Sequence, residues 1–132
     1  MADTLNARQL IQLAKHLTRF QSTITDYKLR HYSTLDDDAK NEIEEALSLL
    51  ATAAGRLYAY SVQLVFPEAA QELVRLGAAA EGLNTFLQTT LKIQRVLDIV
   101  TAVASLAGAV ISHDIEGITL GIDEIIQMAA NN

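Results

Sequence analysis

Apolar residues recur at alternating steps of three and four along the first half of the chain, which is the period of an amphipathic helix. The first stripe, over about 4–32, consists of Leu10, Leu13, Leu17, Phe20, Ile24, Tyr27 and His31. The second stripe, over about 35–66, consists of Ala39, Ile43, Leu47, Leu50, Ala54, Leu57, Ser61 and Leu64. Stripes this narrow must face neighbouring helices, so the pattern predicts an all-α bundle.

The connection between these two helices determines their relative direction. Only Ser33 and Thr34 separate them, and long helices joined by so short a connection run antiparallel. At about 1.5 Å per residue each helix would be about 40–45 Å long, more than the width of a compact chain of this size. We therefore predict one elongated up-down bundle of four or five helices, with the whole chain, 1–132, as a single domain.

The start of the second helix carries a capping signal. A hydroxyl of Ser33 or Thr34 is placed to accept a free amide proton, and Asp36, Asp37 and Asp38 follow in the first turn. Helix capping explains this acidic run better than calcium binding, because the run lacks the alternation and the glycine of an EF-hand loop.

Proline and glycine predict the remaining boundaries. Pro67 disfavours helical geometry at Phe66, and we expect a turn there that reverses the chain before a third helix over about 67–82. Gly82 and Asn84 are a plausible stop before a fourth helix over about 85–112. If Gly82 is tolerated inside a helix, the third and fourth helices instead form one rod of about 45 residues.

The last helix is expected over about 114–130, with Asp114 as its cap. Its apolar face consists of Ile115, Ile118, Ile122, Ile125 and Ala129. The sequence predicts no strand, no flexible linker and no repeat.

Composition excludes several kinds of chemistry. The chain has no cysteine, so disulfides, thiolate metal sites and a cysteine nucleophile are ruled out. No phosphate-binding loop and no nucleophilic serine elbow is present. His113, Asp114 and Glu116 offer three possible metal ligands, but a helix junction accounts for them. We expect no metal, no cofactor and no enzymatic activity. The strongest candidate for catalysis is His113 beside Asp114, but the sequence offers neither an activated nucleophile nor a second base near this pair.

Charge argues against nucleic acid as a partner. The net charge of −6 gives no long-range attraction for phosphates. One local basic strip lies opposite the apolar stripe of the first helix, but the same face lacks aromatic residues to stack on bases. The strip consists of Arg8, Lys15, Arg19 and Arg30.

The segment Val96–Ser112 is the most apolar part of the chain. Asp98 is its one charge, and Ile99–Ser112 carries none over 14 residues. A helix that is apolar on all sides must be enclosed by the bundle, by a partner or by lipid. Spanning a bilayer takes about 20 apolar residues, so a buried helix is the better interpretation.

Small residues four apart also suggest close contacts between helices. Such pairs let backbones approach, and in water they indicate ordinary packing within a bundle more often than pairing in a membrane. The three sets are Ala51, Gly55 and Ala59; Ala104 and Gly108; and Gly117 and Gly121.

These observations predict a non-enzymatic bundle that acts by protein–protein interaction, as a regulatory, inhibitor, immunity or scaffold protein, and that self-associates through its apolar C-terminal half. A membrane-active protein that inserts a hairpin of residues 90–128 is the alternative, and a bundle that holds an apolar small molecule between the fourth and fifth helices is the third. The start of the chain lacks a targeting signal, so a cytoplasmic location is the default expectation, with leaderless secretion as the alternative. The expected contact residues are Val100, Val103, Ile111, Ile118, Ile122 and Ile125.

Overall fold

A computed structural model describes residues 3–4, 7–59, 65–66 and 69–131. This part of the chain is an all-α bundle, as predicted, with five α-helices and one pair of two-residue strands. The helices are α1 (Ala7–Arg30), α2 (Asp37–Ala59), α3 (Ala69–Thr89), α4 (Ile93–Ile111) and α5 (Ile115–Ala130).

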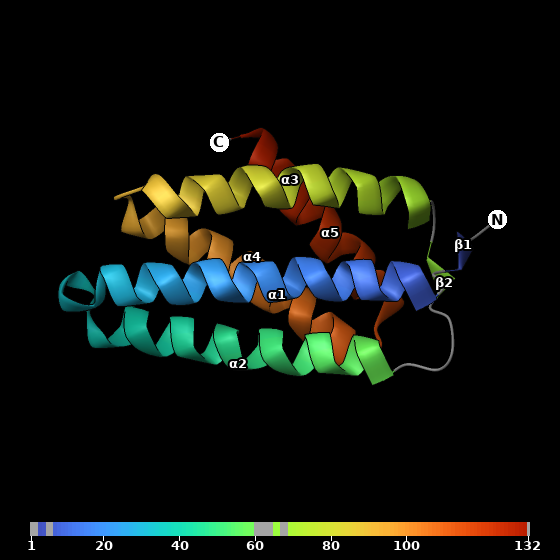
Figure 1. Cartoon of the computed structure of the whole chain (residues 1–132), viewed down its shortest axis with the longest axis horizontal. Helices are drawn as coiled ribbons and strands as arrows, with labels where there is room; N and C mark the ends of the chain where they lie inside the picture. The colour runs from blue at the N-terminus through green and yellow to red at the C-terminus, as the bar shows by residue number, and fades with distance from the viewer. Residues whose placement is uncertain (1–2, 5–6, 60–64, 67–68, 132) are drawn as a thin grey trace.

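The five helices surround one shared core (Figure 1). α1 and α2 run antiparallel, α3 runs back in the direction of α1, and α4 runs in the direction of α2. α1 packs against α2 and α3, α2 against α4, and α5 closes the bundle by contacting both α4 and α3. The helix order around the core is therefore α1, α2, α4, α5, α3, so α3 lies beside α1 and α5 rather than beside the helix that precedes it.

The predicted apolar stripes form this core. Six of the seven stripe residues of the first helix are buried, and His31 is half-buried. In α2, the stripe is buried at Ala39, Ile43, Leu50, Ala54 and Leu57 and half-buried at Leu47, whereas Ser61 and Leu64 lie outside the described residues.

The turn between α1 and α2 differs in detail from the prediction. Residues Tyr32–Thr34 form a short 3₁₀ turn, η1, and α2 begins at Asp37 rather than at residue 35. The cap is Asp36, whose Oδ1 accepts the backbone N–H of Ala39 at 2.7 Å, in place of Ser33 or Thr34. The Thr34 hydroxyl instead donates to the carbonyl of His31.

The two short strands were not predicted. β1 (Asp3–Thr4) pairs antiparallel with β2 (Val65–Phe66), in the register Asp3 with Phe66 and Thr4 with Val65. The first helix therefore begins at Ala7 rather than at residue 4, and the second helix does not extend to residue 66. Phe66 is non-helical and α3 reverses direction relative to α2, which confirms the predicted turn over the kink. Pro67 and Glu68 lie outside the described residues.

The boundary between the third and fourth helices was predicted in the wrong place. α3 continues through Gly82 and Asn84 to Thr89, because Asn84 is buried and its amide donates to the carbonyl of Ala80 at 2.7 Å within the helix. The break comes at Thr90, whose hydroxyl oxygen accepts the backbone N–H of Lys92 at 3.1 Å. A single rod is excluded as well, since α4 turns back from this point.

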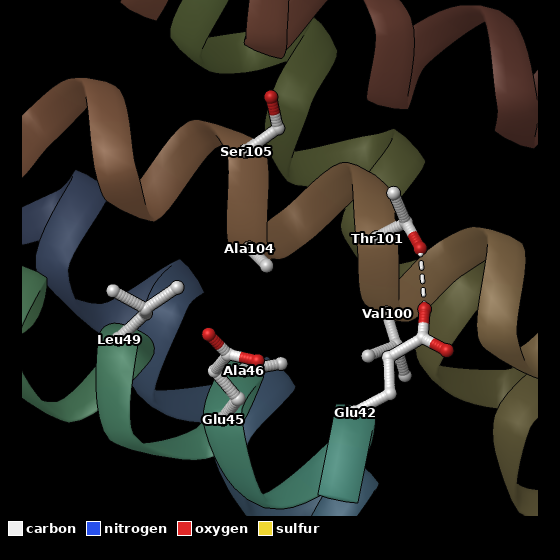
Figure 2. A pocket seen from close by; sticks show the side chains of 8 residues that line it. All are labelled: Glu42, Glu45, Ala46, Leu49, Val100, Thr101, Ala104 and Ser105. Atoms are coloured by element: carbon white, nitrogen blue, oxygen red, sulfur yellow. Dashed lines mark hydrogen bonds between the residues drawn. The ribbon is translucent and has the colours of Figure 1, made fainter. Parts of the chain in front are cut away.

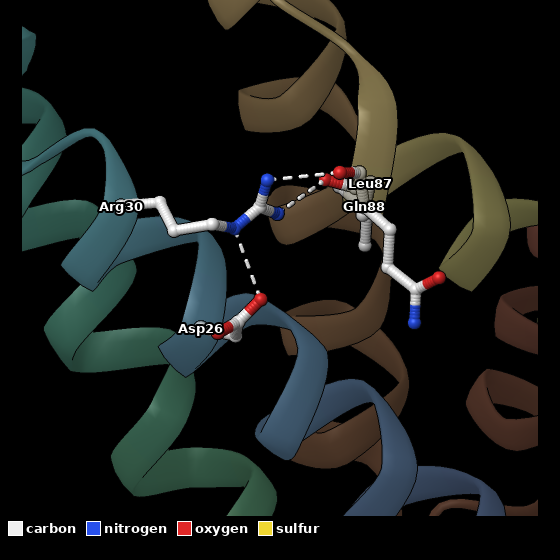
Figure 3. A network of polar contacts seen from close by, with 4 residues as sticks. All are labelled: Asp26, Arg30, Leu87 and Gln88. Carbon is white, nitrogen blue, oxygen red and sulfur yellow. Dashed lines mark hydrogen bonds and ion pairs between the residues drawn. The ribbon is translucent and has the colours of Figure 1, made fainter.

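Arg30 fastens the end of α3 to α1 (Figure 3). Its guanidinium donates to the carbonyl oxygens of Gln88 at 2.8 Å and Leu87 at 3.3 Å, and its Nε donates to Asp26 at 3.0 Å. A cation at the C-terminal end of a helix satisfies carbonyls that have no partner within the helix. One member of the predicted basic strip is thus a structural link between two helices.

The junction of α4 and α5 follows the predicted capping pattern at Asp114. Its side chain accepts the backbone N–H of Gly117 at 3.1 Å, and α5 begins directly after it. His113 lies just beyond α4 in the left-handed region, with φ of 56°. The N–H of His113 bonds to Val110 and that of Asp114 to Ala109, which is the Schellman arrangement. His113 is therefore exposed at a helix end, and is not part of the last turn of α4.

His16 packs between α1 and α3, where its ring faces Gly77. A β-carbon built on Gly77 would lie 3.4 Å from His16 Cε1, which is ordinary van der Waals contact, so the ring packs directly against α3 at this glycine. Burial of the ring, together with the nearby Arg19, lowers the pKa of His16 below its usual 6.5. The neutral imidazole is thus the form that fits this contact.

We expect His16 to make stability fall in weak acid. Because its pKa is lower in the folded than in the unfolded protein, its contribution is complete above pH 6.5 and is lost as the pH falls below that value. His16→Gln should therefore flatten the dependence of the unfolding free energy on pH between 6.5 and 5, measured by urea unfolding. An unchanged slope in that variant contradicts the assignment.

Candidate protein interface

The structure places the predicted contact residues mainly inside the bundle. Val100, Val103, Ile118, Ile122 and Ile125 are fully buried in the core of the chain itself, and Ile111 is half-buried. A contact with a second copy cannot use side chains that are already enclosed by α2, α3 and α5. Helical period alone does not distinguish a core stripe from an interface stripe, which is why the prediction fell on these residues.

The outward face of α4 is lined by small side chains. The buried residues of the helix occupy the opposite face, and the outward residues are exposed or half-buried. From residue 101 to residue 112, all of these outward residues except Ile111 are no larger than threonine and carry no charge, whereas Arg95, Leu97 and Asp98 lie in the first two turns of the helix. We name this surface the α4 ridge; it consists of Thr101, Ala104, Ser105, Gly108, Ala109 and Ser112.

The small-residue pairs behave in two different ways. Gly117 and Gly121 are used in internal packing, as predicted, because a β-carbon on Gly121 would lie 3.2 Å from Leu106 and one on Gly117 would lie 3.1 Å from Ala109. A β-carbon on Gly108 or on Gly55 would meet nothing within 4 Å. The pair of Ala104 and Gly108 therefore permits a close approach from outside the chain, rather than between its own helices.

A groove of about 350 Å³ lies between α2 and α4 (Figure 2). The half-buried Ala104 and Leu49 supply apolar surface, and Glu42 and Glu45 of α2 stand along its border. The hydroxyl of Thr101 donates to Glu42 Oε1 at 2.8 Å, which holds this carboxylate beside the ridge. The full lining is Glu42, Glu45, Ala46, Leu49, Val100, Thr101, Ala104 and Ser105.

A second hollow, of about 430 Å³, lies on the other side of the ridge, between α4 and α5. Ser105 borders both hollows, so the two form one surface that crosses the ridge. Leu120, which is 62% exposed, supplies an apolar side chain on this side. Asp114 and Glu124 are its acidic members.

The ridge and both hollows carry negative charge only. Four carboxylates line the two hollows, and no lysine, arginine or histidine lines either of them among the described residues. The sequence agrees, since residues 96–132 contain five acidic residues and no lysine or arginine. An uncharged ridge of small residues with acids on both sides is suited to a helix that carries basic side chains.

The described residues do not assemble a catalytic or metal-binding group. They contain no cluster of three histidine, aspartate or glutamate residues at metal-binding distance. Asp114 is engaged as a helix cap, and His113 is exposed at the end of α4. The predictions that the protein has no metal, no cofactor and no enzymatic activity remain predictions.

The sequence predicts that the segment Ile99–Ser112 is apolar on all sides. In the structure its large residues are buried except for the half-buried Ile111, and its remaining exposed or half-buried residues are small. Ala102 and Ala107 are small residues that are buried, so side-chain size alone does not identify the outward face. The acids of α2 that border the groove come from about 60 positions earlier, and helical period carries no information about such a contact.

One described helix, α4, is long and apolar enough to cross a membrane by length and composition. A core helix of a soluble protein meets the same criterion. Eight of its residues are buried in the bundle.

Comparisons with protein-family models, with curated proteins and with solved structures find no match to this chain. The residues of the chain itself are therefore the basis for any statement about its function.

Proposed function

We propose that this protein is a non-enzymatic interaction module that self-associates, and that the contact is made on the α4 ridge and the two hollows beside it. The observation that carries the proposal is the shape of α4. In its C-terminal half, large residues such as Val103, Leu106 and Val110 complete the core, while Thr101, Ser105 and Gly108 lie outside, where a β-carbon on Gly108 would meet no atom within 4 Å. Regulatory, inhibitor, immunity and scaffold roles all fit such a module.

The steric argument for the ridge is that small side chains allow two helix backbones to come close. Close approach increases the number of van der Waals contacts per turn, which are individually weak and collectively large. Leu49 and Leu120 stand on opposite sides of the ridge and add apolar surface to the contact. A partner helix laid along the ridge would cover both.

Membrane insertion is the second candidate, and the length and composition of α4 favour it. Insertion of residues 90–128 would require α4 and α5 to leave the bundle and to expose the core faces of α1, α2 and α3. The acids of this segment would also have to be protonated or paired in lipid. Binding of an apolar small molecule between α4 and α5 is less favoured, because the hollow there is open and bordered by Asp114 and Glu124.

We expect the wild-type protein to sediment with a mass above the 14.4 kDa of one chain at micromolar concentration. Ser105→Arg places a long cation on the exposed ridge, and this variant should sediment as a single chain with unchanged helical content. Measurement by sedimentation velocity over a concentration series tests both statements. A wild-type protein that remains at 14.4 kDa throughout contradicts self-association, and co-sedimentation with liposomes would then favour the membrane alternative.

A further inference from the structure

We infer that the occupant of the α4 ridge is the basic outer face of α1 from a second copy of the chain, so that copies associate head to tail. This inference rests on the proposed function and specifies its partner surface. Two observations support it: the two surfaces carry opposite charge, and they have similar lengths along α1 and α4.

The outer face of α1 carries the cations that the ridge lacks. Arg8, Lys15 and Arg19 are exposed on one side of the helix, and none of them forms an ion pair with another described residue. Ile11, which is 37% exposed, lies close to this side and offers an apolar contact. We name this surface the α1 face; it consists of Arg8, Ile11, Lys15 and Arg19.

The two surfaces match in length. At about 1.5 Å per residue, Arg8 and Arg19 are about 16 Å apart along α1, and Thr101 and Ser112 are about 16 Å apart along α4. Lys15 and Arg19 lie one turn apart, as do Glu42 and Glu45 of the groove. A helix laid along the ridge can therefore place successive cations beside successive carboxylates.

A symmetric pairing of two ridges is opposed by charge. Such a pairing would join two surfaces that each carry Glu42, Glu45, Asp114 and Glu124 and that have no lysine, arginine or histidine in their lining. Like charges brought together at an interface repel each other and suppress that pairing. The occupant must therefore bring positive charge, and the α1 face has it.

The α1 face and the α4 ridge of the same chain cannot contact each other. α1 packs against α2 and α3, whereas the ridge lies on the outside of α4 between α2 and α5 (Figure 1). Each copy consequently presents one free α1 face and one free ridge after the first contact forms. A contact between two different surfaces of identical chains produces a ring or an open chain, rather than a closed pair.

Two variants that each disable one surface test this arrangement. Lys15→Gln with Arg19→Gln removes two of the three cations of the α1 face and leaves the ridge intact, whereas Ser105→Arg blocks the ridge and leaves the α1 face intact. Each variant alone should sediment at 14.4 kDa, with association at least about tenfold weaker than in the wild type. Their equimolar mixture should form a species of twice that mass and no larger one, because only one productive contact remains.

The matched control removes the same charge elsewhere. Arg56→Gln with Lys92→Gln neutralises two exposed cations outside the α1 face and should associate like the wild type. Raising the ionic strength should lower the mass of the wild type, because exposed charge contacts are screened by salt.

The outcomes separate the inference from the proposed function. If Ser105→Arg is a single chain but Lys15→Gln with Arg19→Gln associates like the wild type, the ridge is the interface and its occupant is not the α1 face. If the wild type never exceeds the mass of one chain, both statements are wrong. A mixture that stays at the mass of one chain also overturns the head-to-tail contact.

Discussion

We expect the substitution Ile122→Asp to abolish the cooperative folding of the chain, rather than to dissociate an assembly of folded chains. Ile122 is fully buried on the core face of α5, so the substitution removes an apolar side chain and leaves an unpaired carboxylate in the core. The loss of the side chain costs about 2–5 kcal/mol, and an uncompensated buried charge costs about 3–5 kcal/mol. Together these match the whole stability of a typical small domain, about 5–15 kcal/mol. Circular dichroism during urea unfolding measures the effect.

Two companion variants make this prediction specific. Ile122→Ala removes the side chain without adding charge, and should fold with stability lowered by about 2–5 kcal/mol. Gln127→Asp changes an exposed residue of the same helix that lines neither hollow, and should cost no more than about 1 kcal/mol. A folded Ile122→Asp protein of reduced mass would show instead that Ile122 lies at an interface between chains.

We expect Gly121→Val to push α4 and α5 apart and to lower the free energy of unfolding by about 3 kcal/mol. A β-carbon at this position would lie 3.2 Å from both Cα and Cβ of Leu106. The Cα belongs to the backbone of α4, so a rotamer change cannot relieve the contact and the helices must move apart. Overpacking of a core typically costs about 1–3 kcal/mol, and a branched side chain at a helix crossing belongs at the upper end. Thermal unfolding followed by circular dichroism provides the measurement.

Gly82→Ala is the matched control for this effect. Gly82 also lies inside a helix, but a β-carbon there would meet nothing within 4 Å. Replacing an exposed helical glycine with alanine should stabilise the protein by about 0.5–1 kcal/mol. If both glycine variants change stability in the same direction, the close crossing of α4 and α5 at Gly121 is wrong.

The predictions that succeeded rest on local signals. The stripes of α1 and α2 identified the core because a period of three and four fixes which side of a helix is buried. Asp114 was identified as a cap because an aspartate directly before an apolar-periodic segment satisfies a free amide proton. The turn at Phe66 followed from the steric effect of proline on the residue before it.

The predictions that failed depended on tertiary contacts. Gly82 and Asn84 carry helix-stop signals, yet α3 continues because Asn84 is buried and its amide bonds to Ala80. The strand pair of Asp3–Thr4 with Val65–Phe66 joins segments about 60 positions apart, and two residues are too few for a strand pattern. The expected contact residues lie mainly in the core of the chain itself, and the sequence does not separate the two cases because a core stripe and an interface stripe have the same period.

The candidate interface was only partly predictable. The lack of charge in Ile99–Ser112 distinguishes α4 from the other helices, and the pair of Ala104 and Gly108 indicates a close contact on it. Their exposure depends on which helices cover α4, and the ring order α1, α2, α4, α5, α3 cannot be read from helix boundaries. The carboxylates of α2 reach the ridge only because α2 is the neighbour of α4.

A fluorescent reporter beside the α4 ridge tests the central claim most directly. Because the chain has no cysteine, Leu120→Cys at the border of the second hollow provides a unique attachment point for an environment-sensitive dye and leaves the ridge itself unfilled, and Ser33→Cys in the exposed turn between α1 and α2 provides the control. Titration with unlabelled wild-type protein should shift the emission of the dye at 120 to shorter wavelength, reversibly with salt, and leave the dye at 33 unchanged. An increase in mass without any change at 120 would show that copies meet elsewhere, and would contradict the account.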